Sequence, residues 1–199
     1  MKAYHKIMKK KYFQGKNGVY VIAEIGGNHE GNFEYAKYLT ELAAKSGADA
    51  VKYQIYSGET LVNKIYDPKR VKHFKKFQLK KSQYLELALL CKKLGTSFMA
   101  SVWDKAAISY IDEHIEIYKI GSGDLTNYNL LEKFLQTLKP IIISTGLANM
   151  REIEDVVKFI NSKDPSYIEE GKVAILQCSS MYPIPYNDAN LNVINTYNK

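Results

Sequence analysis

Residues 117–124, with the sequence IYKIGSGD, contain the residue types of a small anion-binding site. Lys119 lies in a short apolar stretch, where an ammonium group is costly unless an anion pairs with it. The two glycines that follow allow a ligand to approach the backbone closely, and Ser122 and Asp124 add polar groups. Taken alone, the segment is equally consistent with a strand-end lysine that reaches solvent.

Polar residues also end the other apolar stretches of the chain, which favours a shared site. They are Glu24, Lys52, Gln54, Ser101, Ser144 and residues 177–180. Because alternate residues of a strand share a face, Lys52 and Gln54 point the same way. Glu24 and the lysines would then meet in a dry environment, in which each keeps the other ionised. We therefore predict one polar mouth rather than independent surface residues.

Short apolar strands alternate with helical patterns along most of the chain, which indicates an α/β fold with parallel strands. Gly47 and Gly95 follow two of the helical patterns, as glycine does at helix ends. The predicted strands are residues 19–25, 49–55, 97–102, 117–120, 140–145 and 172–178. The predicted helices are residues 33–46, 82–94, 104–113, 128–138 and 150–162, and Ser82 is expected to cap the second of them.

Both a doubly wound open sheet and a (β/α)8 barrel of the TIM type fit this alternation. A barrel is favoured because all its strands end at one common mouth, whereas an open sheet binds ligands at a single switch point. Six strands do not close such a barrel, so we expect a partial (β/α) barrel over residues 19–199 that holds the first six βα units. Residues 1–18 are expected to form a basic segment or hairpin, and residues 56–81 a functional loop.

Composition excludes several classes of protein. The chain has 199 residues, 46% of them hydrophobic, and a net charge of +7. The basic residues cluster near the N-terminus and in residues 69–81, but no nucleic-acid-binding motif accompanies them. No apolar run reaches the roughly 20 residues that span a bilayer, and no signal peptide is recognisable. We expect a cytoplasmic protein that binds neither nucleic acid nor membrane, with Cys91 and Cys178 as free thiols.

Five collinear motifs are similar to those of the sialic acid synthase family, which comprises N-acetylneuraminate synthases and their legionaminate and pseudaminate relatives. The motifs are residues 22–29 (IAEIGGNH), 51–54 (VKYQ), 118–124 (YKIGSGD), 144–146 (STG) and 177–183 (QCSSMYP). The resemblance implies a (β/α)8 barrel, a small antifreeze-like domain after it, and a homodimer for the full-length protein. The last barrel strands and the antifreeze-like domain would be absent from this chain.

The resemblance also implies a reaction. Family members condense phosphoenolpyruvate with an N-acetylmannosamine-type sugar and release phosphate, with a divalent metal (Mn or Mg) that would polarise the sugar carbonyl. The histidines that bind this metal in the family lie on the last strands, beyond Lys199. The resemblance therefore implies no metal ligand in this chain, and His29, although within the first motif, is not one of them.

The resemblance assigns site roles residue by residue. Glu24 would be the acid–base group or the group that positions water and the sugar hydroxyl, and Asp124 would assist it or hold the substrate. Some members have Glu in place of Asp124 and Asn in place of Ser180, which changes the reach of those side chains. The remaining residues would bind substrate: Lys52, Lys119, Ser122, Ser144 and Ser180 the phosphoenolpyruvate, Gln54 and Tyr182 the sugar, and Ser101 one of the two.

Two other functions stay open at this point. A Schiff-base aldolase would use Lys119 or Lys52 as its nucleophile and needs a desolvated lysine with a low pKa. An inactive, truncated synthase fragment would bind a partner through its basic segments. The sequence does not identify the sugar.

Overall fold

The computed structural model describes residues 12–197, and its main sheet is wound in strict chain order. Within this range six strands pair in parallel in the order β3-β4-β5-β6-β7-β8. A doubly wound sheet would reverse its order at a switch point. The unreversed order therefore identifies a partial barrel of the (β/α)8 type, as predicted. The strands are β3 Ile22–Gly26, β4 Ala50–Ile55, β5 Ser97–Val102, β6 Ile115–Ile120, β7 Ile141–Ser144 and β8 Val173–Leu176.

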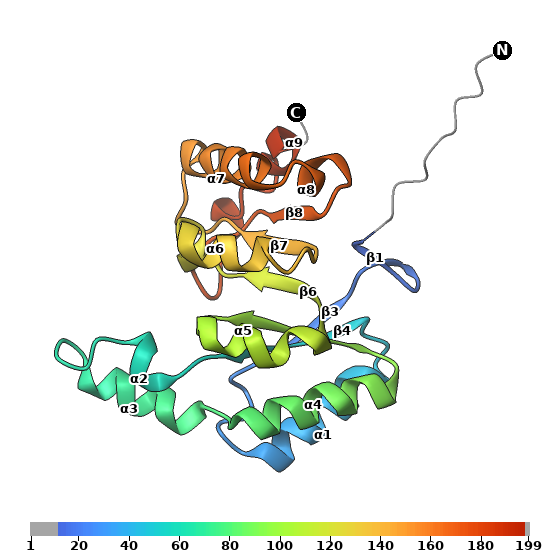
Figure 1. Ribbon diagram of the computed structural model, residues 1–199, viewed down its shortest axis with the longest axis vertical. Helices are drawn as coiled ribbons and strands as arrows, with labels where there is room; N and C mark the ends of the chain where they lie inside the picture. The colour runs from blue at the N-terminus through green and yellow to red at the C-terminus, as the bar shows by residue number, and fades with distance from the viewer. Residues whose placement is uncertain (1–11, 198–199) are drawn as a thin grey trace.

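Helices cover the outer face of the curved sheet (Figure 1). Asn32 caps the first of them through its side chain, and Asn149 and Glu152 form a capping box at the start of the seventh. Gly95, at a φ of 71°, ends the fourth helix in the left-handed conformation. The α-helices are α1 Phe33–Lys45, α2 Gly58–Leu61, α3 Pro68–Phe77, α4 Lys81–Leu94, α5 Lys105–Ile111, α6 Tyr128–Leu135, α7 Met150–Lys163, α8 Ser166–Glu169 and α9 Val193–Tyr197. The 3-10 helices are η1 Asp112–His114, η2 Ser122–Asp124 and η3 Tyr186–Asp188.

The alternation of side chains along the strands produces two separate cores. The outer core, between strands and helices, includes Val51, Tyr53 and Ile55 of β4. The inner core takes one residue from each strand of the barrel: Ile22, Ala50, Met99, Ile117, Ile142 and Ala174. Two residues further along five of the six strands, on the same face, stand Glu24, Lys52, Ser101, Lys119 and Ser144; in β8 this position is Leu176, and the polar residues follow the strand. The inner core therefore lies directly below the polar residues at the mouth of the barrel.

A short antiparallel hairpin closes the amino end of the barrel. It pairs β1 Gln14–Gly15 with β2 Gly18–Val19, and Asp49 accepts hydrogen bonds from the backbone N–H groups of Lys16 and Val21 at 2.9 Å. Phe13 and Tyr20 pack against the inner core. The first barrel strand consequently begins at Ile22 rather than at Val19. The part of the predicted basic segment before residue 12 lies outside the described residues.

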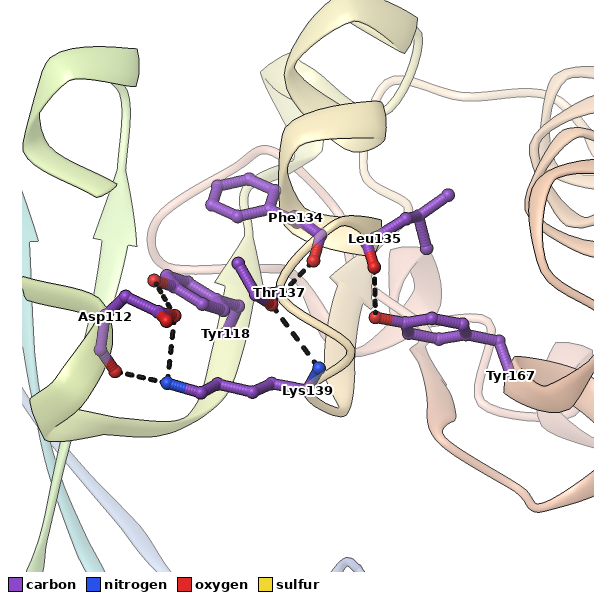
Figure 2. Close-up of polar contacts among 7 residues, drawn as sticks. All are labelled: Asp112, Tyr118, Phe134, Leu135, Thr137, Lys139 and Tyr167. Atoms are coloured by element: carbon purple, nitrogen blue, oxygen red, sulfur yellow. Dashed lines mark hydrogen bonds and ion pairs between the residues drawn. The ribbon is translucent and has the colours of Figure 1, made fainter. Parts of the chain in front are cut away.

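A polar cluster ties β6 to the elements around it at the amino end of the barrel (Figure 2). Asp112 Oδ1 accepts a hydrogen bond from the buried Tyr118 hydroxyl at 2.9 Å and forms an ion pair with Lys139 Nζ at 2.9 Å. The Lys139 ammonium also donates to the backbone carbonyl of Asp112. Nearby, the Tyr167 hydroxyl donates to the Leu135 carbonyl at 3.2 Å, so each of these buried hydroxyls has a partner.

The prediction of a loop over residues 56–81 is wrong, because α2 and α3 occupy much of it. Asp67 accepts a hydrogen bond from the Arg70 N–H, and Pro68 stands at the first helical position, which is a strong helix start. The N-cap of α4 is Lys80 rather than Ser82. The end of α3 packs on the loop after β3, where a Cβ on Gly31 would lie 2.1 Å from the Lys76 carbonyl oxygen.

Within residues 12–197, none of the helices combines the length and the apolar character that crossing a bilayer requires. Cys91 is buried and Cys178 half-buried, and both are free thiols.

Candidate active site

The carboxyl ends of the barrel strands surround a cavity of about 520 Å³. Every strand of the barrel, or the loop that follows it, contributes to its lining. Nine of the ten predicted site residues line this cavity, and the tenth, Asp124, does not. The nine are Glu24, Lys52, Gln54, Ser101, Lys119, Ser122, Ser144, Ser180 and Tyr182.

Glu24 and Lys52 form an ion pair across adjacent strands. They occupy paired register positions on β3 and β4, and Lys52 Nζ lies against Glu24 Oε2. Lys52 Nζ also lies 3.5 Å from Ser101 Oγ. A carboxylate of the protein therefore already compensates the Lys52 charge.

Lys119 is held by neutral acceptors. Its Nζ donates to Ser144 Oγ and, at 3.0 Å, to the Ile120 carbonyl. No carboxylate of the described residues lies within ion-pair distance of this ammonium. Burial, and secondly the positive charge of Lys52, lower the pKa of Lys119 to about 8. The mouth of the barrel thus holds a desolvated cation that no side chain within residues 12–197 neutralises.

Two serine hydroxyls converge beside Gly146, from segments that are far apart in the sequence. Ser122 Oγ accepts a hydrogen bond from the Gly146 N–H at 3.0 Å. A Cβ on Gly146 would lie 2.7 Å from Ser180 Oγ and 2.9 Å from Ser122 Oγ. The absent side chain at this position is what lets both hydroxyls face the cavity.

Gln54 and Tyr182 differ in how closely they are held. A Cβ on Gly26 would lie 2.8 Å from Glu24 Oε1 and 3.5 Å from Gln54 Nε2, so these two side chains meet over Gly26. Tyr182 is 96% exposed and stands at the rim. The structure therefore positions Gln54 beside the ion pair and leaves Tyr182 open to solvent.

Asp124 lines a second cavity of about 600 Å³, which shares Trp103, Gly121 and Ser122 with the first. Burial raises the pKa of the Asp124 carboxyl, and hydrogen bonds from the side chains of Trp103 and Asn127 partly oppose this. Asp124 is therefore a neighbour of the anion cavity rather than a partner of Glu24 within it.

Several lining residues were not among the ten predicted site residues, and Trp103, Cys178 and Asn28 are three of them. Trp103 follows β5 directly and stands two residues after Ser101. The alternation of side chains along a strand, continued one residue past the end of β5, places both on the same face. Cys178 donates to Ser144 Oγ at 3.3 Å, and its position just after β8 was the available signal. Asn28 lies in the turn after β3, where no periodicity points to it.

The metal implied by the family does not fit the described residues. Within residues 12–197, no three His, Cys, Asp or Glu side chains come together as metal ligands would. His29 is buried, and its Nδ1 accepts a hydrogen bond from the Gly31 N–H at 3.0 Å. This contact gives His29 a role in shaping the loop.

The arrangement is suited to binding a small anion with two acidic groups. Lysine ammonium groups and serine hydroxyls are donors for phosphate and carboxylate oxygens, and charge-assisted hydrogen bonds are about twice as strong as neutral ones. The Glu24 carboxylate at the same mouth can exchange protons with a bound reactant.

Comparisons with known proteins agree with this site and fold. The NeuB family model matches residues 39–199. Protein MJ1065 of Methanocaldococcus jannaschii, itself uncharacterised, is 36% identical over 178 residues, which cover 89% of this chain and 51% of that protein. The N-acetylneuraminate-9-phosphate synthase of Mus musculus is 32% identical over 201 residues, which cover 95% of this chain and 54% of the relative.

A solved structure gives the same result. The crystal structure of N-acetylneuraminic acid synthetase from Leptospira borgpetersenii serovar Hardjo-bovis, in complex with citrate, matches with a TM-score of 0.81 and 31% identity. The match covers 89% of this chain and 60% of that one. The chain spans about half the length of the curated relatives it matches. The chain therefore belongs to the NeuB family, the family of sialic acid synthases.

Proposed function

We propose that the cavity at the carboxyl ends of the strands binds phosphoenolpyruvate for condensation with an N-acetylmannosamine-type sugar. The observation that carries the proposal is the Lys119 ammonium, which is buried, held by Ser144 and Ile120, and without a carboxylate partner in the described part of the chain. A desolvated cation of this kind costs free energy that a bound anion returns. The membership of the chain in a synthase family supports the same reaction class.

The second lysine and the serines complete a site for an anion with two acidic groups. Lys52 is shared between Glu24 and the cavity, and Ser122 and Ser180 approach from the opposite side, at Gly146. The citrate in the Leptospira relative is also a small molecule with several carboxylates. We infer that Lys119 and Ser144 bind one acidic group of phosphoenolpyruvate and that Lys52 and Ser101 bind the other.

In the proposed reaction, carbon 3 of phosphoenolpyruvate forms a bond to the aldehyde carbon of the open-chain sugar. The aldehyde oxygen takes a proton and becomes a hydroxyl group. Water adds to carbon 2 and loses one proton, which leaves a hydroxyl group there. This hydroxyl passes its remaining proton to the departing phosphate as the bond between carbon 2 and the phosphate oxygen breaks, and a keto acid and inorganic phosphate result. Glu24, paired with Lys52 at the mouth, is the proposed acid–base group for these proton transfers.

The name of the mouse relative describes a product with phosphate on carbon 9. Phosphoenolpyruvate supplies three carbons, so carbon 9 of that product corresponds to carbon 6 of the sugar. For the present chain the proposal leaves the acceptor open between a neutral sugar and its 6-phosphate. We also propose that the ligands are small molecules, that the protein is cytoplasmic, and that a full-length member of the family is a homodimer.

Release of phosphate tests the reaction. Purified protein is mixed with phosphoenolpyruvate, N-acetylmannosamine or its 6-phosphate, and added manganese, and inorganic phosphate is measured with time. We expect release that requires the sugar and is lost in Lys119→Met but not in Lys158→Met, a change on the exposed face of α7. Release without sugar would contradict the proposal. If phosphoenolpyruvate binds but no phosphate is released, the proposed binding site is still supported and the alternative of an inactive fragment is favoured.

A Schiff-base aldolase remains a second candidate because the pKa of Lys119 is lowered to about 8. A lysine of this kind is a better nucleophile near neutral pH than an ordinary one. Incubation with pyruvate and borohydride, followed by peptide mass spectrometry, distinguishes the two functions. A reduced adduct on Lys119 would favour the aldolase, whereas protection of an unmodified Lys119 by phosphoenolpyruvate would favour the synthase.

A further inference from the structure

The second cavity has a cation on its rim that the proposed reaction does not yet use. This cavity lies between the α2–α3 segment and the loop after β6, and it opens onto the first through Trp103, Gly121 and Ser122. In Figure 1 the α2–α3 segment projects from the body of the molecule, so that it forms an outer wall. Arg70 of α3 lines this wall.

Arg70 is an exposed residue, and its guanidinium lies over one aromatic ring of the cavity lining. It stacks on the ring of Phe74, with its central carbon 5.6 Å from the ring centroid. Phe74 in turn meets Tyr56 edge to face, and Tyr56 lies 5.6 Å from Trp103 between ring centroids. Among the ion pairs formed by residues 12–197, the carboxylate near α3 belongs to Glu59, which pairs with Lys75. Arg70 is therefore a cation at the rim of the cavity, beside Phe74, for which no ion pair with a carboxylate of the described residues is found.

The rest of the lining is divided by chemistry. Leu61, Val62 and Phe74 supply apolar surface, while Asn63 and Asp124 supply hydrogen-bonding groups. Burial makes Asp124 harder to ionise, so that it is suited to exchanging hydrogen bonds with hydroxyl groups. A ligand that matches this lining carries hydroxyls, a small apolar group and a negative charge at the end that reaches Arg70.

We propose that the second cavity holds the end of the acceptor sugar remote from its aldehyde, while the aldehyde end stays at the mouth beside Gln54, and that Arg70 selects an acceptor that carries a phosphate at the remote end. The inference rests on the proposed function of the first cavity, because the aldehyde must reach phosphoenolpyruvate past Gly121 and Ser122. Arginine suits this role because its planar fork can bind two phosphate oxygens at once. The acyl group of the sugar packs on Leu61 and Val62.

Calorimetric titration tests the selection without requiring turnover. The unmodified protein is titrated with N-acetylmannosamine 6-phosphate and with N-acetylmannosamine. We expect the phosphorylated sugar to bind about 10- to 100-fold more tightly, the range given by a charge-assisted hydrogen bond. Trp103 is the one tryptophan of the sequence and lines both cavities, so a change in its fluorescence confirms that a ligand binds at one of them.

Two variants on the same helix complete the experiment. Arg70→Gln should bring the affinity for the phosphorylated sugar down to that for the neutral sugar, and leave the affinity for phosphoenolpyruvate unchanged. Lys72→Gln removes the same charge from an exposed position outside the cavity lining and should change neither. Equal binding of the two sugars by the unmodified protein, or equal losses in both variants, would overturn the inference.

The titrations also separate this inference from the function on which it rests. If phosphoenolpyruvate does not bind, the proposed function fails regardless of the result for the sugars. If phosphoenolpyruvate binds and the sugars are not distinguished by their phosphate, the role of Arg70 fails and the first cavity stands.

Discussion

The two ends of the barrel each contain a lysine, and the two lysines differ in the groups that accept their hydrogen bonds. At the amino end, Lys139 pairs with the Asp112 carboxylate, which also accepts the hydrogen bond of the Tyr118 hydroxyl (Figure 2). At the carboxyl end, Lys119 is desolvated, and its acceptors among the described residues are a serine and a carbonyl. One lysine is satisfied within the protein, and the other needs a ligand.

The difference teaches how a single fold separates stability from binding. Parallel strands in a barrel carry their ligand sites at the carboxyl ends, and residues at the amino ends serve stability. Here the same division appears in which lysine has a carboxylate partner: Asp112 pairs with Lys139 at the amino end, and no carboxylate of the described residues pairs with Lys119 at the carboxyl end. We expect changes at the amino end to alter the free energy of unfolding, and changes at the carboxyl end to alter the affinity for phosphoenolpyruvate.

The largest effect is expected for Lys119→Met. Loss of the buried ammonium should weaken phosphoenolpyruvate binding about 100-fold, because a charge-assisted contact contributes about 1.5–3 kcal/mol. Thermal unfolding at pH 7 should occur at the same or a higher temperature, since a desolvated cation is removed. Calorimetry and thermal melts measure both. Lys139→Met is the matched control and should lower the melting temperature while retaining affinity. The contrast between the two ends is contradicted if both substitutions weaken phosphoenolpyruvate binding or if both lower the melting temperature.

Asp112→Ala should give the next largest effect, at the opposite end. The buried Tyr118 hydroxyl would lose its acceptor and Lys139 its partner, at a cost of about 2 kcal/mol after allowance for the partial exposure of the ion pair. Denaturant unfolding measures the change. Glu113→Ala, on the adjacent exposed residue, should alter stability by less than about 0.5 kcal/mol. An equal loss in both variants would remove the special role of Asp112.

Gly146→Ala should produce a smaller loss confined to binding. The added methyl group would overlap Ser180 Oγ and Ser122 Oγ, and displacing these hydroxyls should weaken phosphoenolpyruvate binding about tenfold. Titration calorimetry gives the affinity, and a circular dichroism melt establishes that the variant is folded. Unchanged affinity in a folded variant would exclude the two serines from the site.

The smallest effect is expected from pH. The folded pKa of Lys119, about 8, lies below its ordinary value of 10.5, so the cation is lost as pH rises through 8. Phosphoenolpyruvate keeps its charge in this range, because the second pKa of a phosphate is about 6. Affinity should therefore fall about fourfold between pH 7 and pH 8.5.

The same shift predicts the opposite trend for stability. Between about pH 8 and pH 10.5 the unfolded chain binds more protons at Lys119 than the folded chain does, so this group increases stability as pH rises. In Lys119→Met both trends should disappear. A pH profile of affinity that is the same in the variant would assign the titration to another group.

Strand alternation made most of the site predictable. Ala50, Lys52 and Gln54 share one face of β4 because the side-chain period of a strand is 2, and this period alone predicts that the lysine faces the mouth. The preference for a barrel depended on nearly every strand ending in a polar residue, and the sheet order confirms the barrel. The family resemblance is likewise confirmed.

Tertiary packing accounts for what was not predictable. Asp124 follows β6 closely in the sequence, but η2 carries it toward Trp103 and the second cavity, and a change of direction within a short turn has no periodic signal. The helix α3 has no fully buried residue, but Val71, Phe74 and Phe77 recur every three residues along it, and the prediction of a loop did not take this short apolar stripe into account. Asp67 and Pro68 form the local signal that predicts the start of this helix.

The contact between Gly31 and α3 has an evolutionary consequence. Any side chain at position 31 would collide with the Lys76 carbonyl, and Gly31 also has a φ of 80°, so two constraints act on one residue. The basic face of α3 meets no comparable constraint from the backbone of the described residues. Among descendants of this sequence, drift should therefore leave position 31 fixed while α3 diversifies, and substrate preference can change by substitution on that helix without rebuilding the barrel.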